Sequence, residues 1–384
     1  MKKSIDWPTT LFLILAHTIG IVGTSLYVYF NGVHPMDIFN FLFFYILTGI
    51  SITAGYHRYF SHRSYDSHYL LRLFYVIFGA CAYENSALRW TSDHRRHHKF
   101  VDTDQDPYNI KQGGWYAHMG WIFHKTKNVN FDNVKDLMMD PLIMWQKKYY
   151  LPIAIVVGSV LPFLIGLSVG RPWGGFLWGG FFRVMFVHHA TFFINSLAHI
   201  VGKQPYSDQD TSRDSWWLAF LTYGEGYHNF HHKFQADYRN GIRWYHWDPS
   251  KWMIHICAKL NLACKLNRTP PQKILNAKLS MDLLHVRKKA NWISHELWEK
   301  IHSQLQEHRQ QLELAAERWS ALKLGYEKIK LSKMNQSKEF MVRWEHKLKI
   351  QERRFKHAKQ NWQTALRSVT LETKLFQNAP ASNN

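Results

Sequence analysis

The segment IFNFLFFYILTGISITAGYHRYFSH, residues 38–62, decides the fold of this 384-residue chain. Its apolar part, Ile38–Tyr56, is long enough to cross the hydrocarbon core of a membrane as a helix. Two histidines, His57 and His62, follow at one end. The segment therefore predicts a membrane helix that presents imidazole side chains, which commonly bind metal ions, at its boundary with water.

Three more apolar segments of similar length surround this one. Thr9–Phe30 precedes it, and Tyr149–Val169 and Phe176–Ala198 follow it. The short connectors Asn31–Asp37 and Gly170–Gly175 join the segments in pairs, so we expect an all-α membrane protein with four transmembrane helices in two hairpins. Both termini then lie on the same side of the membrane.

The distribution of charge predicts which side that is. Lys2, Lys3 and the basic segments 57–148 and 233–384 all lie on one side of the spans, and the positive-inside rule assigns that side to the cytoplasm. We expect a multi-pass protein of the inner (cytoplasmic) membrane, with its active site and both termini cytoplasmic. The formal net charge of +20 fits a surface facing anionic lipid headgroups better than a nucleic acid partner.

The polar segments 57–148 and 199–265 are expected to fold as a cytoplasmic helical cap, so that residues 1–265 form one membrane domain. Within the cap, Leu70–Ala82 is apolar but short, and Arg72 interrupts it. These features favour a helix at the interface or packed on the domain over a fifth span.

Residues 266–384 are predicted to form a cytoplasmic extension of amphipathic helices with a disordered end from about Gln377. Apolar residues recur there at helical spacing: Trp292, Ile293, Leu297, Ile301 and Leu305, then Leu312, Ala316, Trp319 and Leu322. The extension is either a coiled-coil or partner-docking arm, or a solvated addition that packs on the membrane domain.

Three histidine clusters carry the strongest chemical signal: His57 and His62; His94, His97 and His98; His228, His231 and His232. Neutral imidazole is a common ligand of iron, copper and zinc, and residues at i, i+3 and i+4 share one face of a helix. Eight such side chains exceed what one ion can bind, so two adjacent metal ions are predicted. Three cysteines without a CxxC pair argue against thiolate ligands and fit a reducing compartment: Cys81, Cys257 and Cys264.

The sequence NSLAH at the end of the fourth predicted span adds two candidates. Asn195 and His199 lie one helical turn apart. Polar groups at that depth are costly unless they have partners. His199 is therefore predicted as a ninth metal-binding imidazole, and Asn195 as a tenth group that binds directly or through water.

The four motifs together resemble those of a known family. HRYFSH (57–62), DHRRHH (93–98), NSLAH (195–199) and GEGYHNFHH (224–232) are similar to the boxes of the integral-membrane fatty acyl desaturases, particularly the Δ9 acyl-CoA (stearoyl-CoA) type and its bacterial relatives. Their order and their positions relative to the spans also match. The resemblance covers roughly residues 8–265 and leaves out the extension.

The resemblance implies an O₂-dependent oxidoreductase that introduces a cis double bond, expected at Δ9, into a long-chain saturated acyl group in unsaturated fatty acid biosynthesis. It implies a centre of two iron ions, Fe²⁺ at rest, held by the nine histidines and Asn195, with no other catalytic residue. Neutral ligands leave the charge of the irons largely uncompensated, which favours strongly oxidising chemistry. An unactivated methylene has no acidic proton, so acid–base catalysis alone would not remove its hydrogen.

The resemblance also implies that the acyl headgroup stays at the cytoplasmic surface while the tail enters a bent apolar tunnel, whose shape selects the carbon that reacts. Candidate substrate contacts are Asn85, Arg89, Trp90, Lys125 and Thr191, with Tyr83 and Phe192 as further wall residues. Ser92 stands where animal acyl-CoA members often have Arg. A long-chain acyl-CoA is the first expectation, and acyl carrier protein or a glycerolipid stays open.

Carboxylates beside the histidine boxes are expected to orient the imidazoles through their second ring nitrogen. The candidates are Asp93, Asp102, Asp104, Asp106 and Glu225. His188 shares a helical face with Asn195, but the family's motifs require no metal-binding group there. Arg183, deep in the fourth predicted span, is expected to reach water or bind loop carbonyls instead of contacting substrate.

Two other functions stay open. A hydroxylase or alkane monooxygenase with the same metals begins with the same removal of hydrogen from a methylene. A membrane metal carrier would use clustered histidines only to bind ions, although transporters usually place such ligands near the bilayer midplane.

The electrons for an oxidase must come from another protein. The chain contains no haem-binding HPGG box, no flavin motif and no Cys₄ iron–sulfur spacing. A ferredoxin-like or cytochrome b5-like donor with its reductase is therefore expected, and the basic cytoplasmic face would steer an acidic donor.

Overall fold

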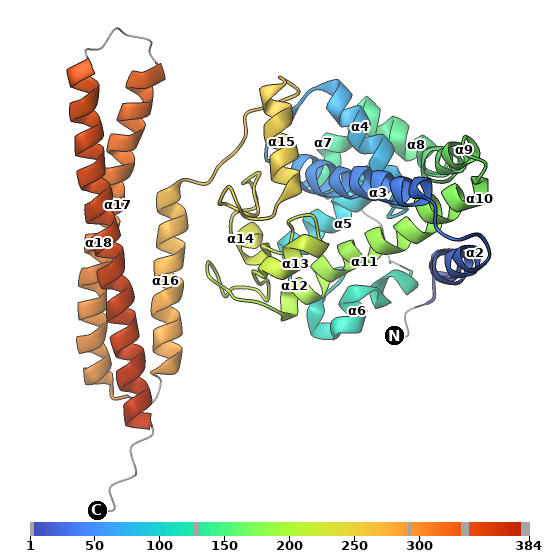
Figure 1. Ribbon diagram of the computed structural model, residues 1–384. Helices are drawn as coiled ribbons and strands as arrows, with labels where there is room; N and C mark the ends of the chain where they lie inside the picture. Colours follow the sequence, from blue (N-terminus) through green and yellow to red (C-terminus); the bar gives the residue numbers. More distant parts are fainter. Residues whose placement is uncertain (1–3, 126–130, 291–292, 332–337, 378–384) are drawn as a thin grey trace, which may run out of the picture. The chain divides into compact units, whose positions relative to one another are not determined.

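A computed structural model describes residues 4–125, 131–290, 293–331 and 338–377 of this protein (Figure 1). The described chain is mostly helical, as the sequence predicts, and it divides into two compact units, Met1–Arg268 and Thr269–Asn384. Four features named from the sequence lie outside the described residues: Lys2, Lys3, Trp292 and the tail after Gln377.

In the first unit, three of the described helices are long and apolar enough to cross a membrane: Trp7–Asn31, Pro35–Ser61 and Pro141–Leu167. They confirm the first three predicted spans, with somewhat different ends. Each helix includes π-helical turns. Their parts are α1 (Trp7–Thr18), η1 (Ile19–Gly23) and α2 (Thr24–Asn31); α3 (Pro35–Ile50) and η2 (Ser51–Ser61); α8 (Pro141–Ile155), η6 (Val156–Val160) and α9 (Leu161–Leu167).

The third of these helices begins well before the predicted Tyr149. Asp140 caps its first turn, because the Asp140 carboxylate accepts a hydrogen bond from the Leu142 backbone N–H. Tyr149 then departs from helical geometry, with φ −105° and ψ 17°, and Pro152 follows without a backbone N–H. The continuous apolar part starts only after this bend, which explains why the sequence pattern predicted the start there.

The fourth predicted span coincides with a helix that runs from Pro172 to Asn195 through α10 (Pro172–Gly175), η7 (Phe176–Phe182) and α11 (Arg183–Asn195). This helix is not among the three that qualify as spans by length and hydropathy. Arg183, His188 and His189 lower its mean hydropathy. A fourth span therefore stays a prediction.

The Arg183 side chain is fully buried within this helix bundle. It donates hydrogen bonds to the carbonyl oxygens of Cys81, Gly158 and Gly179 at 2.5–2.9 Å. Carbonyl oxygens therefore solvate the guanidinium inside the protein, in agreement with the prediction that Arg183 binds carbonyls.

Short helices complete the first unit. The apolar segment Leu70–Ala82, predicted as a helix at the interface or packed on the domain, forms α4 (Tyr69–Ala80), whose Leu71, Tyr75 and Val76 are buried against η2 and α8. The other elements are α5 (Ala87–Phe100), η3 (Ile110–Gln112), α6 (Gly114–His118), η4 (Gly120–Phe123), η5 (Asp132–Val134), α7 (Lys135–Met138), α12 (Leu197–Ile200), α13 (Trp216–Leu221), α14 (His228–Lys233) and α15 (Pro249–Lys259), with strands β1 (Asp66–Ser67) and β2 (Ala263–Cys264) paired antiparallel.

The second unit consists of three long helices, α16 (Pro271–Lys289), α17 (His295–Leu331) and α18 (Lys338–Gln377). They share a core that includes Leu279, Leu283, Trp298, Leu305, Leu312 and Trp362. Of the apolar residues singled out by their spacing, Ile301, Leu305, Leu312 and Ala316 are buried, whereas Leu297 is 43% exposed. Helical periodicity therefore identified most of the packed face of α17.

Gly49 in α3 offers a test of how closely the cap packs on the second span. A Cβ atom at this position would lie 1.9 Å from Cζ of Tyr223. We expect Gly49→Ala to destabilise the first unit by about 1–3 kcal/mol because the Tyr223 ring must move. Gly180→Ala is the matched control, since its nearest neighbour would lie at 3.8 Å. Equal apparent melting temperatures of the two purified variants would contradict this packing.

Candidate metal centre

The first histidine box lies on the π-helix η2. The backbone N–H of His62 donates to the carbonyl oxygen of His57 at 3.2 Å, an i to i+5 hydrogen bond. This wider turn places both imidazoles on one face of the helix, with ring centroids 4.8 Å apart. An ordinary α-helix would rotate two residues with this spacing away from each other.

The other boxes lie on α5, α12 and α14 and divide between two groups of side chains. The first group contains His57, His62, His94, His98 and His231, and the second contains His97, His199, His228 and His232. Within each group, the candidate ligand atoms all lie within 4.8 Å of one another. The structure thus brings all nine predicted histidines together, and the HxxHH motifs of α5 and α14 each contribute to both groups.

The Nε2 atoms of these rings point toward one another. His57 and His231 approach at 2.9 Å, His62 and His94 at 2.9 Å, and His98 and His231 at 3.1 Å. In the second group, Nε2 of His228 lies 3.2 Å from that of His199 and 3.1 Å from that of His232. Converging lone pairs repel one another unless a proton or a cation lies between them, so this donor set fits metal ions.

Three of these histidines contact a carboxylate outside the two groups through their other ring nitrogen, Nδ1. Nδ1 of His57 lies 3.0 Å from Glu225, Nδ1 of His97 lies 2.9 Å from Asp106, and Nδ1 of His232 lies 3.4 Å from Asp210. A carboxylate at Nδ1 holds the proton there and leaves the Nε2 lone pair free for a metal.

A longer chain reaches His199. Its Nδ1 lies 2.8 Å from the hydroxyl oxygen of Thr211, which donates to Asp102 at 2.7 Å. Of the five predicted carboxylates, Asp102, Asp106 and Glu225 therefore contact the cluster directly or through one side chain. Asp93 instead forms an ion pair with Arg89, and Asp104 is exposed.

Burial favours the uncharged form of several of these imidazoles. It lowers the pKa of His94, His199, His228 and His231 well below the ordinary value, and repulsion from neighbouring histidines lowers it further. Neutral imidazoles retain the lone pair that a metal needs. These four side chains can therefore bind a metal without first losing a proton.

Glu225 joins the first and third boxes. Its carboxylate contacts His57 and also accepts hydrogen bonds from the Arg58 guanidinium, whose Nη2 lies 2.8 Å from Oε1 of Glu225. Burial raises the pKa of this carboxyl, whereas His57 and Arg58 lower it, and the balance holds the pKa at about 2. Glu225 is thus ionised at neutral pH.

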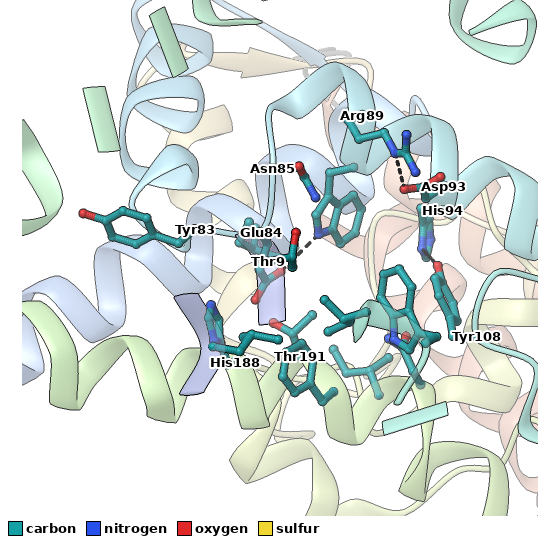
Figure 2. A pocket seen from close by; sticks show the side chains of 18 of the residues that line it. Thr9, Tyr83, Glu84, Asn85, Arg89, Asp93, His94, Tyr108, His188 and Thr191 are labelled. Carbon is teal, nitrogen blue, oxygen red and sulfur yellow. Dashed lines mark hydrogen bonds and ion pairs between the residues drawn. The ribbon is translucent and has the colours of Figure 1, made fainter. Parts of the chain in front are cut away.

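A cavity of about 410 Å³ opens beside the first histidine group. His57, His94, Asn195 and Glu225 line one part of it. All five predicted substrate residues also line it, as do Tyr83 and Phe192: Asn85, Arg89, Trp90, Lys125 and Thr191. Figure 2 shows Arg89 and Asp93 near His94, while His188, Glu84 and Thr191 gather around another part of the cavity.

The contacts described for His188 are with residues outside the two histidine groups. Its Nε2 lies 2.7 Å from the carbonyl oxygen of Ala82, and its ring stacks on Phe192. His188 therefore belongs to the cavity wall, and these contacts give it no role in orienting the metal-binding imidazoles.

The residues that contact the site or the cavity but were not identified from the sequence include Glu84, Tyr108, Asp210 and Thr211. Tyr108 hydroxyl lies 3.4 Å from Nδ1 of His94. Asp210 and Thr211 sit in a polar loop apart from every histidine box, so only the tertiary structure brings them there. Glu84, two residues before the N-cap of α5, carried no signal beyond its nearness to Asn85.

Glu84 is a buried acid on the cavity wall. Trp90 donates its indole N–H to the Glu84 carboxyl at 3.1 Å. Burial raises the pKa of Glu84 from 4.5 to about 7, although hydrogen bonds from Thr191 and Trp90 lower it. Protonated Glu84 is therefore the form that the fold favours in weakly acidic solution.

Changing Glu225 to Gln should weaken metal binding, measured with iron, about 10–100-fold, because the amide no longer holds the Nδ1 proton of His57 as a charged acceptor. Iron retained by the purified protein against graded chelator measures the change, and circular dichroism checks that the helices persist. Asp104→Asn is the control, since Asp104 is exposed in a neighbouring loop. Equal iron affinity in both variants would contradict the role of Glu225.

Stability should fall with rising pH through the titration of Glu84. A folded-state pKa above the unfolded one adds stability that is present below about pH 4.5 and lost as pH rises through about 7. The difference between the two pKa values corresponds to about 3 kcal/mol in the free energy of unfolding. Glu84→Gln should remove this component, so that its melting temperature changes less than wild type between about pH 5 and pH 9. If the melting temperatures of the variant and the wild type changed with pH by the same amount, Glu84 would have an ordinary pKa.

Comparison with known proteins identifies the family. A family model described as fatty acid desaturase matches residues 36–265. The chain is 44% identical over 257 residues to a probable acyl-CoA desaturase of Schizosaccharomyces pombe, covering 65% of this chain and 54% of that protein. It is 42% identical over 299 residues to acyl-CoA desaturase 1 of Saccharomyces cerevisiae, covering 76% and 58%.

A bacterial relative matches along nearly its whole length. The sn-1 stearoyl-lipid 9-desaturase of Anabaena variabilis is 35% identical over 264 residues, covering 68% of this chain and 94% of that protein. The two yeast proteins are matched over little more than half of their length. The family model spans more than half of the sequence and includes every histidine of the two buried groups, and this chain therefore belongs to the fatty acid desaturase family.

Proposed function

We propose that this chain is an O₂-dependent acyl desaturase that introduces a cis double bond at Δ9 into a long-chain saturated acyl group. One observation carries the proposal: two adjacent groups of histidines have inward-facing Nε2 atoms, and the first group borders a cavity large enough for a small-molecule ligand. The printed names of the relatives, acyl-CoA desaturases and a stearoyl-lipid 9-desaturase, support the reaction and its position.

The two groups would hold two iron ions. His57, His62, His94, His98 and His231 would bind one, and His97, His199, His228 and His232 the other, with Asn195 as the tenth group. Bound iron would supply the one-electron chemistry with O₂ that removal of hydrogen from an unactivated methylene requires. The carboxylates at Nδ1 of His57, His97 and His232 would keep these three rings oriented.

The cavity would hold the acyl chain. Trp90, Thr191 and Phe192 would fix its position against the first histidine group, so that only one pair of methylenes lies within reach. Phe192 is buried, and its ring would help to keep water from the reacting carbons. Double-bond position would follow from the shape of the cavity, because neighbouring methylenes do not differ in chemistry.

The polar end of the cavity would receive the acyl carrier. Arg89, Lys125, His124 and Asn85 line it, and cations there suit the phosphates of coenzyme A. Ser92, at the position where many animal relatives have Arg, hydrogen bonds Asn133 at 2.8 Å instead of lining the cavity. We therefore take acyl-CoA as the first substrate class, and the Anabaena relative makes a glycerolipid the alternative.

The surroundings of the site complete the proposal. The helix from Pro172 to Asn195 would be the fourth span, with Arg183 solvated inside the protein, and the histidine boxes and both termini would face the cytoplasm. A cytochrome b5-like or ferredoxin-like protein with its reductase would deliver the two electrons. Its acidic face would meet the basic side chains of the cap.

Gas chromatography of fatty acids from a desaturase-deficient host tests the reaction. Cells expressing this chain should accumulate a new cis monoene at Δ9 only with O₂, and His98→Ala should remove it. His346→Ala, an exposed histidine in the second unit, should leave the product unchanged. Hydroxylated chains alone would make the enzyme a hydroxylase, and iron uptake without O₂ consumption would make it a metal carrier.

A further inference from the structure

The two helices that flank the third histidine box carry a continuous apolar surface. We call it the aromatic belt, and its side chains are between 37% and 68% exposed: Trp216, Phe220, Trp247, Trp252, Ile256 and Leu260. Ring contacts connect its members. Phe220 stacks on Trp247 with centroids 4.9 Å apart, and Trp247 lies 5.4 Å from Trp252. The belt is therefore one surface built from α13, α15 and the loop before α15.

Both helices carry exposed apolar side chains as well as buried ones. On α13, Leu218 and Ala219 are buried, while the outward positions are all apolar: Trp216, Trp217, Phe220 and Leu221. On α15, Ile254 and Cys257 are buried, and the exposed residues Trp252, Ile256 and Leu260 form an apolar stripe at i, i+4 and i+8 beside the exposed polar residues His255 and Lys259. A contiguous exposed apolar stripe of this kind indicates an apolar partner.

The depth of the belt follows from the spans. On Trp7–Asn31, exposed apolar side chains extend from Trp7 to Phe30. This distance is about 35 Å at 1.5 Å per residue, enough to cross a hydrocarbon core of ~30 Å with Trp7 at its boundary. On the second helix, Pro35–Ser61, Thr53 lies about 27 Å along from the start, which is less than the thickness of that core.

Both belt helices are attached to that buried part of the second span. Tyr223, just after α13, donates its hydroxyl proton to the carbonyl oxygen of Tyr45 at 2.9 Å. Ser250, in the first turn of α15, lies 2.5 Å from the hydroxyl oxygen of Thr53. These two hydrogen bonds hold α13 and α15 beside the part of the second span that its length assigns to the hydrocarbon layer.

The loop that carries Trp247 is held in place. Lys251 is buried, and its ammonium donates to the carbonyl oxygens of Gly241, Arg243 and His246 at 2.8–3.1 Å. The belt is therefore a rigid surface. Its exposed neighbours Arg243 and Lys259 are cations, and tryptophan is enriched where a bilayer meets water.

We propose that the aromatic belt is a lipid-binding surface, inserted into the interfacial layer of the bilayer so that α13 and α15 lie along the membrane plane. Acyl carbons would cover the rings, while headgroup phosphates would accept hydrogen bonds from Arg243 and Lys259. The helices on either side of Glu225–His232 would then fix the height of the third histidine box above the membrane.

Spin-label accessibility in phospholipid nanodiscs tests the belt directly. Single cysteines at Phe220, Trp252, Ile256 and Leu260 would be labelled in the full-length Cys264→Ser protein, because Cys264 is exposed and the other two cysteines are buried. Bilayers of phosphatidylcholine and phosphatidylglycerol supply the lipid. Collisions with O₂, which concentrates among acyl chains, are compared with collisions with a water-soluble nickel chelate.

Two control positions define the collision ratios expected in lipid and in water. Leu15→Cys reports the lipid-facing side of the first span, and Gln105→Cys reports an exposed polar loop. We expect O₂-to-nickel ratios at the belt to match Leu15 and to exceed Gln105 several-fold. Ratios equal to Gln105 would overturn the proposal by placing the belt in water. Low collision rates with both reagents would overturn it in favour of a protein partner, such as a second copy of the chain.

Discussion

The structure depends on keeping nine imidazole rings in one buried volume with their Nε2 atoms facing inward. Neutral rings pack there without charge repulsion, but each ring can turn, and each carries a proton that could sit on the wrong nitrogen. Hydrogen bonds from Nδ1 to Glu225, Asp106, Asp210 and Thr211 remove that freedom for four of them. The surrounding acids come from loops, so the loops as well as the helices determine the geometry of the centre.

Arg58 shows how the boxes are joined. It follows His57 on the second span and binds Glu225 and Asp248 with its guanidinium, at 2.8 Å and 2.9 Å. Asp248 also caps α15, because it accepts a hydrogen bond from the Lys251 backbone N–H. One buried cation therefore connects the first box, the third box and the helix after it. Replacing it would leave two buried carboxylates without their shared cation, which costs several kcal/mol.

The sequence predicted the parts of this protein that depend on local pattern. Apolar length identified three spans, and the i, i+3 and i+4 spacing identified the histidines. It missed Asp210 and Thr211 because their role arises from a loop that folds back on the cluster. It also treated Ile38–Tyr56 as a span that ends before His57, whereas the helix continues as π-helical turns to Ser61. No composition rule distinguishes such turns from an ordinary helix end.

The first unit reverses the usual arrangement of polar and apolar groups near a membrane. Arg183 is buried inside the helix bundle, where it is solvated by the carbonyl oxygens of Cys81 and Gly158 and by that of Gly179, four residues earlier on its own helix. The outer faces of α13 and α15 carry exposed apolar side chains although both helices belong to the cap. In the proposed arrangement the metal-binding groups lie where the spans end, so the cap would approach the bilayer closely enough to complete them. A cap held farther away would leave His228, His231 and His232 out of reach of the histidines on the second span.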